Sequence, residues 1–404
     1  MQKRFTPDAG GVFPEWEEIE FGKLFQRRSE KNGEEFGVDK TISVATMHFK
    51  PEGNKADEKS LPKYKVMRTG DIAFEGHINK HFKHGRFVLN DIGDGIISPI
   101  FEVLQPVSEL SKEVPGFWKY YINYEPVMGK ILAKCANTGI MMNRLSIKDF
   151  YKQKIKVPCI EEQRKIAAAL AAYDEMIAVK TAKLETWQEC KKRMVKEIFG
   201  RTKRFRDDDG NEFPEWEEKT LGEISEPLKY GMSAAAVKYD GENKYLRITD
   251  IDESSRKYVS DKIVSPEASK VAEKFLVQKN DLLFARTGAS VGKTYLYDEA
   301  DGKMYYAGYL IKAHIKPEYD SQFIFQLTLT DEFKKWIKKE SMRTAQPGIN
   351  AECLTKYKIM IPCMKEQQKI GSFLAEIDKE IEIQKEFIKT YAEGKKRMMR
   401  ELME

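Results

Sequence analysis

An internal repeat constrains the architecture of this chain more than any other feature. Two lead segments, residues 4–18 and 204–218, share Arg-Phe, Asp, Gly and Phe-Pro-Glu-Trp-Glu-Glu in the same order and spacing. Farther on, Pro-Cys-x-x-Glu-Gln-x-Lys-Ile begins at both Pro158 and Pro362, and 17 of the 42 residues from 158 to 199 match those 204 positions later. Between these anchors the halves barely agree. Matching frames around divergent contents indicate two related modules that do one kind of job on different targets.

The length of 404 residues is sufficient for two to four domains with real cores. The repeat predicts a module over 1–157, a helix over 158–200, a second module over 201–361 and a second helix over 362–404. No apolar run approaches the roughly 20 residues that a membrane span needs, and Met1-Gln2-Lys3-Arg4 leads into no apolar signal region. The five cysteines are scattered, without CxxC spacing. We therefore expect a cytoplasmic protein without a membrane segment, disulfides or a metal cluster.

The net charge of +5 is too small to indicate a nucleic-acid partner by itself. Its distribution is more informative, because Lys63–Leu89 holds six Lys or Arg against two acids, together with three histidines. This stretch is either a solvated basic loop or a surface that contacts phosphates.

Both segments after the Pro-Cys motif predict long helices with one apolar seam. The apolar positions follow alternating steps of four and three residues, a period of 3.5 that is typical of coiled coils. Eight seam positions are apolar in each copy: Ile166, Leu170, Tyr173, Ile177, Leu184, Trp187, Met194 and Ile198, and then Ile370, Leu374, Ile377, Ile381, Ile388, Tyr391, Met398 and Leu402. The polar exceptions coincide, at Lys180 and Lys191 and at Gln384 and Lys395.

The matched seams predict that the two helices pair with each other, although each could instead pack on its own module. The second module follows the first helix directly, so the second helix can return along the first only antiparallel. About 40 residues at 1.5 Å each give rods of roughly 60 Å. We expect a pseudo-two-fold arrangement with one module at each end.

The modules predict an α+β fold, with a small twisted sheet and flanking helices. Short runs of strand-forming residues alternate with turns rich in Gly, Asp and Asn. The expected strands are 42–47, 72–74, 87–89, 245–248, 282–285 and 293–297. Helices are expected at 116–133 and 321–339.

Several stretches resemble catalytic motifs only in part. The segment Gly288–Thr294 lacks the first glycine of a phosphate loop, since position 287 is Thr287. The triplet Asp57-Glu58-Lys59 is half of a nuclease motif, and no Pro-Pro-Tyr-like loop for a flipped base is present. The histidines from His77 to His84 are interleaved with Lys and Arg, which oppose a metal cation. The chain is therefore predicted to be non-catalytic and to bind no metal.

Over its whole length the chain resembles the DNA-specificity subunit of Type I restriction–modification enzymes. Four features carry the resemblance: the repeated Phe-Pro-Glu-Trp-Glu-Glu, Asp281-Leu-Leu-Phe-Ala-Arg-Thr-Gly-Ala-Ser-Val-Gly-Lys293, Gln346-Pro-Gly-Ile-Asn350, and the Pro-x-x-x-Glu-Gln-x-x-Ile opening of both helices. The first module departs from this pattern. It has Gly70-Asp-Ile-Ala-Phe-Glu-Gly-His where the Phe-Ala-Arg loop is expected, and Asn137-Thr-Gly-Ile near the place of Gln-Pro-Gly-Ile.

The resemblance implies two target-recognition domains, each reading one half of an asymmetric bipartite site in double-stranded DNA, with the helix pair as spacer. It also implies two methyltransferase subunits that bind S-adenosylmethionine, and restriction subunits, motor–nucleases that use ATP and Mg²⁺. We expect none of these cofactors to bind this chain. Two alternatives stay open: a coiled-coil adaptor that binds nucleic acid without sequence specificity, and a self-contained restriction or modification enzyme.

Candidate DNA contacts follow from loop position and charge. In the second module they are Arg286, Thr287, Ser290 and Lys293, in a glycine-punctuated loop after a predicted strand, together with Gln346 and Asn350 of the resembling motif. In the first module they are Lys80, Lys83 and Arg86. Each loop could instead be a structural turn with solvated charges.

Overall fold

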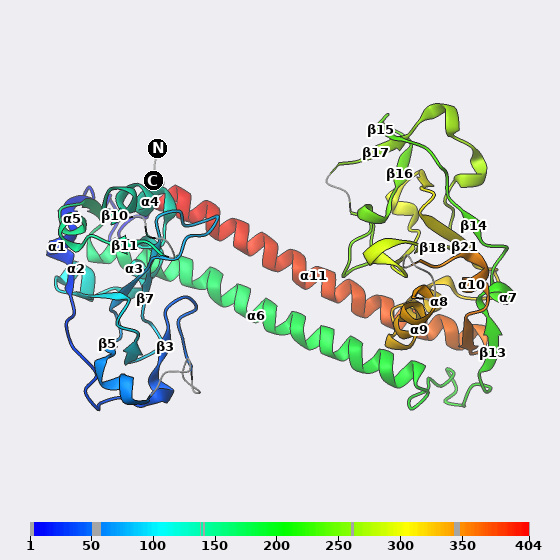
Figure 1. Ribbon diagram of the computed structural model, residues 1–404, viewed down its shortest axis with the longest axis horizontal. Helices are drawn as coiled ribbons and strands as arrows, with labels where there is room; N and C mark the ends of the chain where they lie inside the picture. Colours follow the sequence, from blue (N-terminus) through cyan, green and yellow to red (C-terminus); the bar gives the residue numbers. More distant parts are fainter. Residues whose placement is uncertain are drawn as a thin grey trace. The chain divides into compact units, whose positions relative to one another are not determined.

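The computed structural model of the protein describes residues 4–50, 58–137, 139, 142–259, 262–342 and 348–403. The chain divides into two compact units, Met1–Val179 with Phe387–Glu404, and Lys180–Glu386. Each unit contains one module and a part of both long helices (Figure 1). The predicted α+β class is confirmed.

The first unit is built on a four-stranded antiparallel sheet in the order β2-β9-β6-β7. Its strands are β2 (Phe25–Arg27), β9 (Glu102–Pro106), β6 (Ile72–Glu75) and β7 (Arg86–Leu89). Four two-stranded pairs accompany it: β1 (Glu17–Glu20) with β12 (Lys154–Val157), β3 (Ile42–Ser43) with β4 (His48–Phe49), β5 (Lys65–Met67) with β8 (Gly95–Ile97), and β10 (Ala136–Asn137) with β11 (Arg144–Leu145). The helices of the module are α1 (Phe21–Leu24), α2 (Glu109–Lys112), α3 (Pro115–Tyr121), α4 (Glu125–Cys135) and α5 (Ile147–Tyr151). Helices α3 and α4 contact β7, and the core between helices and sheet is rich in buried aromatic side chains.

The second unit repeats this plan. Its four-stranded sheet has the order β14-β21-β18-β19, with β14 (Lys229–Tyr230), β21 (Leu310–His314), β18 (Asp281–Ala285) and β19 (Thr294–Leu296). The pairs are β13 (Glu217–Thr220) with β22 (Lys358–Ile361), β15 (Ala236–Lys238) with β17 (Val264–Pro266), and the parallel β16 (Lys244–Leu246) with β20 (Met304–Tyr306). The helices are α7 (Leu221–Ile224), α8 (Ser321–Thr328), α9 (Asp331–Ser341) and α10 (Ala351–Thr355). In both four-stranded sheets the third strand pairs with the strand that follows it in the chain, β6 with β7 and β18 with β19, so the two sheets share a topology.

Most predicted elements exist, with corrections to their lengths. The strand expected at 42–47 is only β3, because the chain turns back at Met47, which has a φ of +44°. The helix expected at 116–133 is two helices, α3 and α4, and the second begins with Pro126 in its first turn. The helix expected at 321–339 also divides, because Thr330 caps α9 by accepting a hydrogen bond from the Phe333 amide.

The two long helices are α6 (Ile160–Phe199) and α11 (Met364–Met403), and they pack antiparallel. In the first unit, Lys395 near the end of α11 binds Asp174 near the start of α6, with an N–O distance of 2.6 Å. In the second unit, Lys191 near the end of α6 binds Asp378 near the start of α11 at 2.5 Å. These are the same contact with the helices exchanged, because 204 positions separate Asp174 from Asp378 and Lys191 from Lys395.

Seam side chains of both helices enter the core of each unit. In the first unit, Ile166 and Leu170 of α6 are buried in one cluster with Leu402 of α11. In the second, Met194 and Ile198 of α6 are buried with four early seam residues of α11, Ile370, Leu374, Ile377 and Ile381. The remaining seam side chains are half-buried: Tyr173, Ile177, Leu184, Trp187, Ile388, Tyr391 and Met398. Neither module core is complete without both helices.

One buried carboxylate in each unit ties the lead segment to the start of a helix. Glu162 is 1% exposed and accepts hydrogen bonds from Arg4 Nη2 at 2.7 Å and from Trp16 Nε1 at 3.1 Å. Gln163 beside it donates to the Pro158 carbonyl. The lead segment then continues into β1, which pairs with the strand before the helix, β12.

The second copy repeats every contact. Glu366 is fully buried and accepts from Arg204 Nη2 at 2.9 Å and Trp216 Nε1 at 3.2 Å, and Gln367 donates to the Pro362 carbonyl. The repeated residues therefore form one structural unit, here named the glutamate anchor: Arg4, Trp16 and Glu162 in the first copy, and Arg204, Trp216 and Glu366 in the second. The residues repeated in the sequence are those that form this contact.

Replacing Arg4 tests the anchor. We expect Arg4→Ala to destabilise the first unit by about 3 kcal/mol, because it leaves the buried Glu162 carboxylate without its ion-pair partner. Amide hydrogen exchange in β1 and β12 should accelerate, while β13 and β22 keep their protection.

The matched control is Glu15→Ala. Glu15 also binds Arg4 but is 98% exposed, so its loss should cost less than about 0.5 kcal/mol. Equal effects of the two variants would show that the buried carboxylate does not hold the lead segment.

Candidate nucleic-acid interface

The loop after β18 begins with Arg286, whose main chain is held from two sides. Its amide donates to the Tyr309 carbonyl at 3.0 Å, and its carbonyl accepts from the Ile349 amide at 2.9 Å. The guanidinium carbon lies 4.9 Å from the centre of the Tyr230 ring, a cation–π contact. The next residue, Thr287, forms an isolated antiparallel bridge with Gly348. The loop is therefore ordered at its first residues.

Two residues of this loop have a positive φ, which explains why both are glycines. Gly288 has a φ of +74° and opens a short turn that ends at Ser290, which is half-buried. Gly292 has a φ of +80°, and a Cβ atom there would lie 2.6 Å from the side chain of Ile337 in α9. The loop packs closely on α9, as glycine at this position permits.

Lys293 ends the loop and is engaged within the protein. Its side chain is 8% exposed, and its ammonium group donates to the Ile251 carbonyl at 3.0 Å and pairs with Glu253 at 2.9 Å. A phosphate contact by Lys293 would require it to leave these partners. The geometry favours a structural role, in which Lys293 holds the 251–253 turn against the sheet.

Asn350 and Gln346 were the other candidates in the second module. Asn350 is exposed and caps α10, since its side-chain oxygen accepts a hydrogen bond from the Cys353 amide at 2.7 Å. Its amide nitrogen is the group that could still face a ligand. Gln346 lies outside the described residues, as does Asp57 of the nuclease-like triplet.

In the first module, the candidate cations lie on the connection between β6 and β7. Lys80 and Lys83 are exposed. Arg86 starts β7 and is engaged, because its guanidinium donates to Glu75 at 2.7 Å and to the Ala45 carbonyl at 2.6 Å. Lys80 and Lys83 are therefore the more available charges of the three.

The position equivalent to Arg286 in the first module is Gly76. Its carbonyl accepts from the Asn143 amide at 2.8 Å, as the Arg286 carbonyl accepts from Ile349. A Cβ atom on Gly76 would lie 2.0 Å from the Asn143 carbonyl oxygen, so this position admits no side chain without a shift of the chain. The frame is conserved between modules, but the side chain it presents is not.

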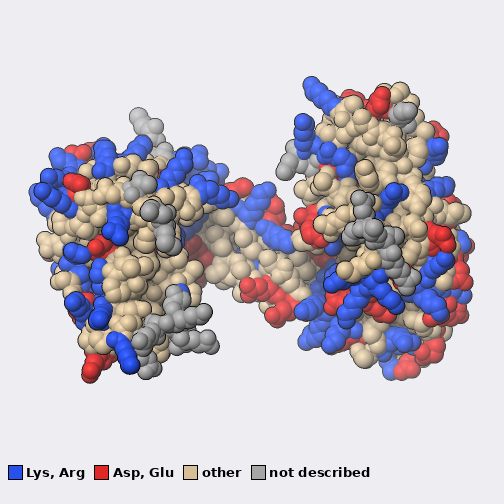
Figure 2. All heavy atoms as spheres, viewed as in Figure 1, with Lys and Arg blue, Asp and Glu red and all other residues tan. Residues whose placement is uncertain are grey.

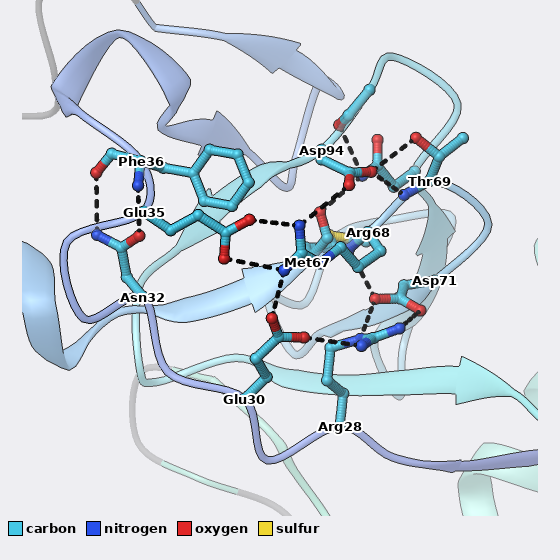
Figure 3. Close-up of polar contacts among 12 residues, drawn as sticks. Arg28, Glu30, Asn32, Glu35, Phe36, Met67, Arg68, Thr69, Asp71 and Asp94 are labelled. Atoms are coloured by element: carbon cyan, nitrogen blue, oxygen red, sulfur yellow. Dashed lines mark hydrogen bonds and ion pairs between the residues drawn. The ribbon is translucent and has the colours of Figure 1, made fainter.

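Each module also has a buried aspartate at the start of a central strand, and sequence reasoning missed its role. Asp71 precedes β6, accepts from the Arg68 amide at 2.7 Å and pairs with Arg28 at 2.6 Å (Figure 3). Burial raises the pKa of the Asp71 carboxyl despite its hydrogen bond from Arg28. Asp281 at the start of β18 is fully buried and lies 3.0 Å from the Lys312 ammonium. The available signal was an aspartate directly before an apolar strand in both modules.

Figure 3 also shows how basic residues of the first module are neutralised internally. The Arg68 guanidinium binds Glu30, binds Glu35 at 2.6 Å and binds Asp94 at 3.2 Å. The hydrogen bond from Arg68 lowers the pKa of Glu30, and the Thr69 amide lowers the pKa of Asp94. Arg68 belongs to the basic stretch from Lys63 to Leu89, yet its charge is used within the fold.

Two further surface residues were not foreseen, Tyr230 at 40% exposure and Tyr309 at 63%. Both lie next to Arg286, and no feature of the sequence distinguishes them from the other tyrosines. On the visible faces in Figure 2, Lys and Arg side chains are spread over both units with acidic side chains among them. No single basic stripe marks the interface on these faces.

The described part of the chain holds no group of three or more His, Cys, Asp or Glu side chains suited to a metal ion. Across the same residues, none of the helices combines the length and apolar character that a membrane crossing requires.

Comparison with known proteins identifies the family. The family model for the Type I restriction modification DNA specificity domain matches residues 103–186 and 214–390. The Type I restriction enzyme MjaVIII specificity subunit of Methanocaldococcus jannaschii is 25% identical over 322 residues, which cover 76% of this chain and 73% of that protein. The putative Type I restriction enzyme MjaX specificity subunit of the same organism is 25% identical over 400 residues, covering 96% and 90%.

The fold agrees with a solved relative. The crystal structure of the S subunit of a Type I restriction–modification system from M. genitalium superposes with a TM-score of 0.65 at 15% identity, over 99% of both chains. The family match includes the last part of the first module, most of the second module and a part of each long helix, in agreement with the resemblance carried by the repeated motifs. The chain belongs to the family of DNA-specificity subunits of Type I restriction–modification enzymes.

Proposed function

We propose that this chain binds double-stranded DNA sequence-specifically and that each module reads one half of an asymmetric bipartite site. The observation that carries the proposal is the contrast between Arg286 and Gly76, two equivalent positions in one conserved frame. A binder without sequence preference has no need of different side chains at equivalent loop positions. The adaptor alternative is therefore the weaker one.

We also propose that the chain is non-catalytic and directs partner subunits to the site. The partners are two methyltransferase subunits that carry S-adenosylmethionine, and restriction subunits that use ATP and Mg²⁺. The duplicated contacts of the helices, Lys191 with Asp378 and Lys395 with Asp174, support two equivalent docking places for two copies of one partner. A self-contained enzyme would instead need its own catalytic groups.

Reconstitution tests this function. The purified chain alone should neither methylate nor cleave DNA, whereas the chain with its methyltransferase subunits should methylate adenine within one bipartite sequence. Sequencing of modified bases after incubation with genomic DNA measures the site directly. Methyl transfer by the chain alone would contradict the proposal, and methylation without a shared sequence would favour the adaptor.

We propose further that the paired helices act as a spacer that sets the gap between the half-sites. Half-sites on one face of the DNA lie about one helical turn apart, roughly 34 Å between centres. Four residues inserted in both helices, near Lys180 and Gln384, add about 6 Å along the pair. A four-residue insertion disturbs a coiled-coil seam least.

The expected result is a gap longer by one or two base pairs, at ~3.4 Å each, with both half-sites unchanged. Modified-base sequencing of the insertion variant reads the new gap. An insertion in one helix alone is the control, since it mismatches the seams and should lower activity. A fully active double insertion with the original gap would show that the helices do not set the spacing.

Salt dependence separates DNA contacts from structural cations. Lys83→Ala should lower the slope of log K against log salt by about 1, because each phosphate contact releases counterions. Lys293→Ala should leave this slope unchanged and lower stability instead, since the buried ammonium binds Ile251 and Glu253. The exposed Lys154, which faces Glu18 at 3.6 Å, serves as a control expected to change neither. A reduced slope of log K against log salt for Lys293→Ala would show instead that Lys293 contacts a phosphate.

A further inference from the structure

We propose that Arg286 reads the guanine of a G·C base pair in the half-site of the second module, and that Tyr230 positions its guanidinium for this. The inference rests on the proposed DNA-binding function and assigns one base pair within it. The first module has no equivalent reader, because Gly76 takes the corresponding place.

The Tyr230 ring is a fixed platform. Its hydroxyl oxygen accepts a hydrogen bond from the Ala351 amide at 3.0 Å, and its carbonyl accepts from the Tyr306 hydroxyl at 3.4 Å. The ring is therefore held through both its hydroxyl and its main chain. Because the Arg286 guanidinium lies 4.9 Å from the centre of this ring, the side chain loses less conformational entropy when it meets a ligand.

The charge of Arg286 is available. Three other cations of the second module are paired with acids: Lys293 with Glu253, Lys312 with Asp281, and Arg247 with Asp250. Among the described residues, Arg286 is in no ion pair of this kind. A guanidinium that is positioned but not neutralised is suited to an acceptor outside the protein.

The guanidinium geometry is suited to a base edge. A planar guanidinium presents two parallel N–H donors that match O6 and N7 of guanine in the major groove, and this is the commonest specific contact of arginine. The last pair of the β18–β21 ladder is Ala285 with Leu310. The next two residues, Arg286 and Tyr309, therefore lie opposite each other, and the Arg286 amide donates to the Tyr309 carbonyl. Side chains of opposite residues share a face of the sheet. The exposed Tyr309 ring is thus placed to contact the adjoining base.

Asymmetry between the modules follows from the same contacts. In the first module, the guanidinium of Arg86 is bound to Glu75 and the Ala45 carbonyl, and lies 5.2 Å from the Phe82 ring. That arginine is used within the fold, and Gly76 admits no side chain. The effect of losing Arg286 should therefore be confined to one half-site.

The test uses the chain in complex with its methyltransferase subunits and a duplex library in which every position of the site is varied. Arg286→Ala should lose discrimination at one G·C pair of one half-site by roughly 10–100-fold, while the other positions keep their preference. Arg286→Lys keeps the positive charge but not the two parallel N–H donors, so it should lose a large part of the same discrimination. Tyr230→Phe removes the hydroxyl that binds Ala351, and it should reduce the discrimination at this G·C pair by a smaller factor.

Arg206→Ala is the matched control, because Arg206 is an exposed arginine of the same module that is paired with Glu212. It should leave every position unchanged. Unaltered discrimination in Arg286→Ala would overturn the assignment, and so would a uniform loss of affinity with a salt slope lowered by about 1, which denotes a phosphate contact. If the unmodified complex itself shows no sequence preference, the proposed function fails and not the assignment alone.

Discussion

The buried carboxylates of Glu162 and Glu366 are the contacts on which the rest of the structure depends. A carboxylate without solvent must be paired and hydrogen-bonded, and here an arginine and a tryptophan of the lead segment supply the donors. Both glutamates lie in the first turn of a long helix, where the helix dipole favours negative charge. One acid therefore fixes the start of a helix, the path of the lead segment and the strand pair that closes the module.

This anchor explains why the chain is repeated in some places and not in others. Residues that form the anchor or the helix seam contact each other, and a change in one leaves a buried charge or a cavity at the other. The loops after β6 and β18 contribute no residue to the anchor or to the seam. Arg286 and Gly76 occupy equivalent positions and keep the same main-chain hydrogen bond, yet they present different chemistry. The fold thus separates a constant frame from variable loop positions, which suits the proposed recognition of two different half-sites.

Sequence reasoning succeeded where the signal was periodic and failed where it depended on contacts across the fold. The helices were predictable because a 3.5-residue period over 40 residues has few alternatives. The divisions at Pro126 and Thr330 were within reach, since proline in a first turn and a threonine before two acids are helix-start signals. The burial of Lys293 was not, because its partners Ile251 and Glu253 lie 40 or more residues away and only the folded sheet brings them together.

The same argument shows why charge counts are a poor guide to a DNA-reading surface in this fold. The basic stretch of the first module contains Arg68 and Arg86, and both are neutralised by carboxylates within the module. Arg286, by contrast, belongs to no conspicuous basic run, but an aromatic ring and two main-chain hydrogen bonds hold it at the surface. Affinity for DNA can come from any cation near the backbone, whereas reading a base needs a donor with a fixed direction. On the proposed assignment, the residues that confer specificity are those whose position the frame fixes and whose charge it leaves unpaired.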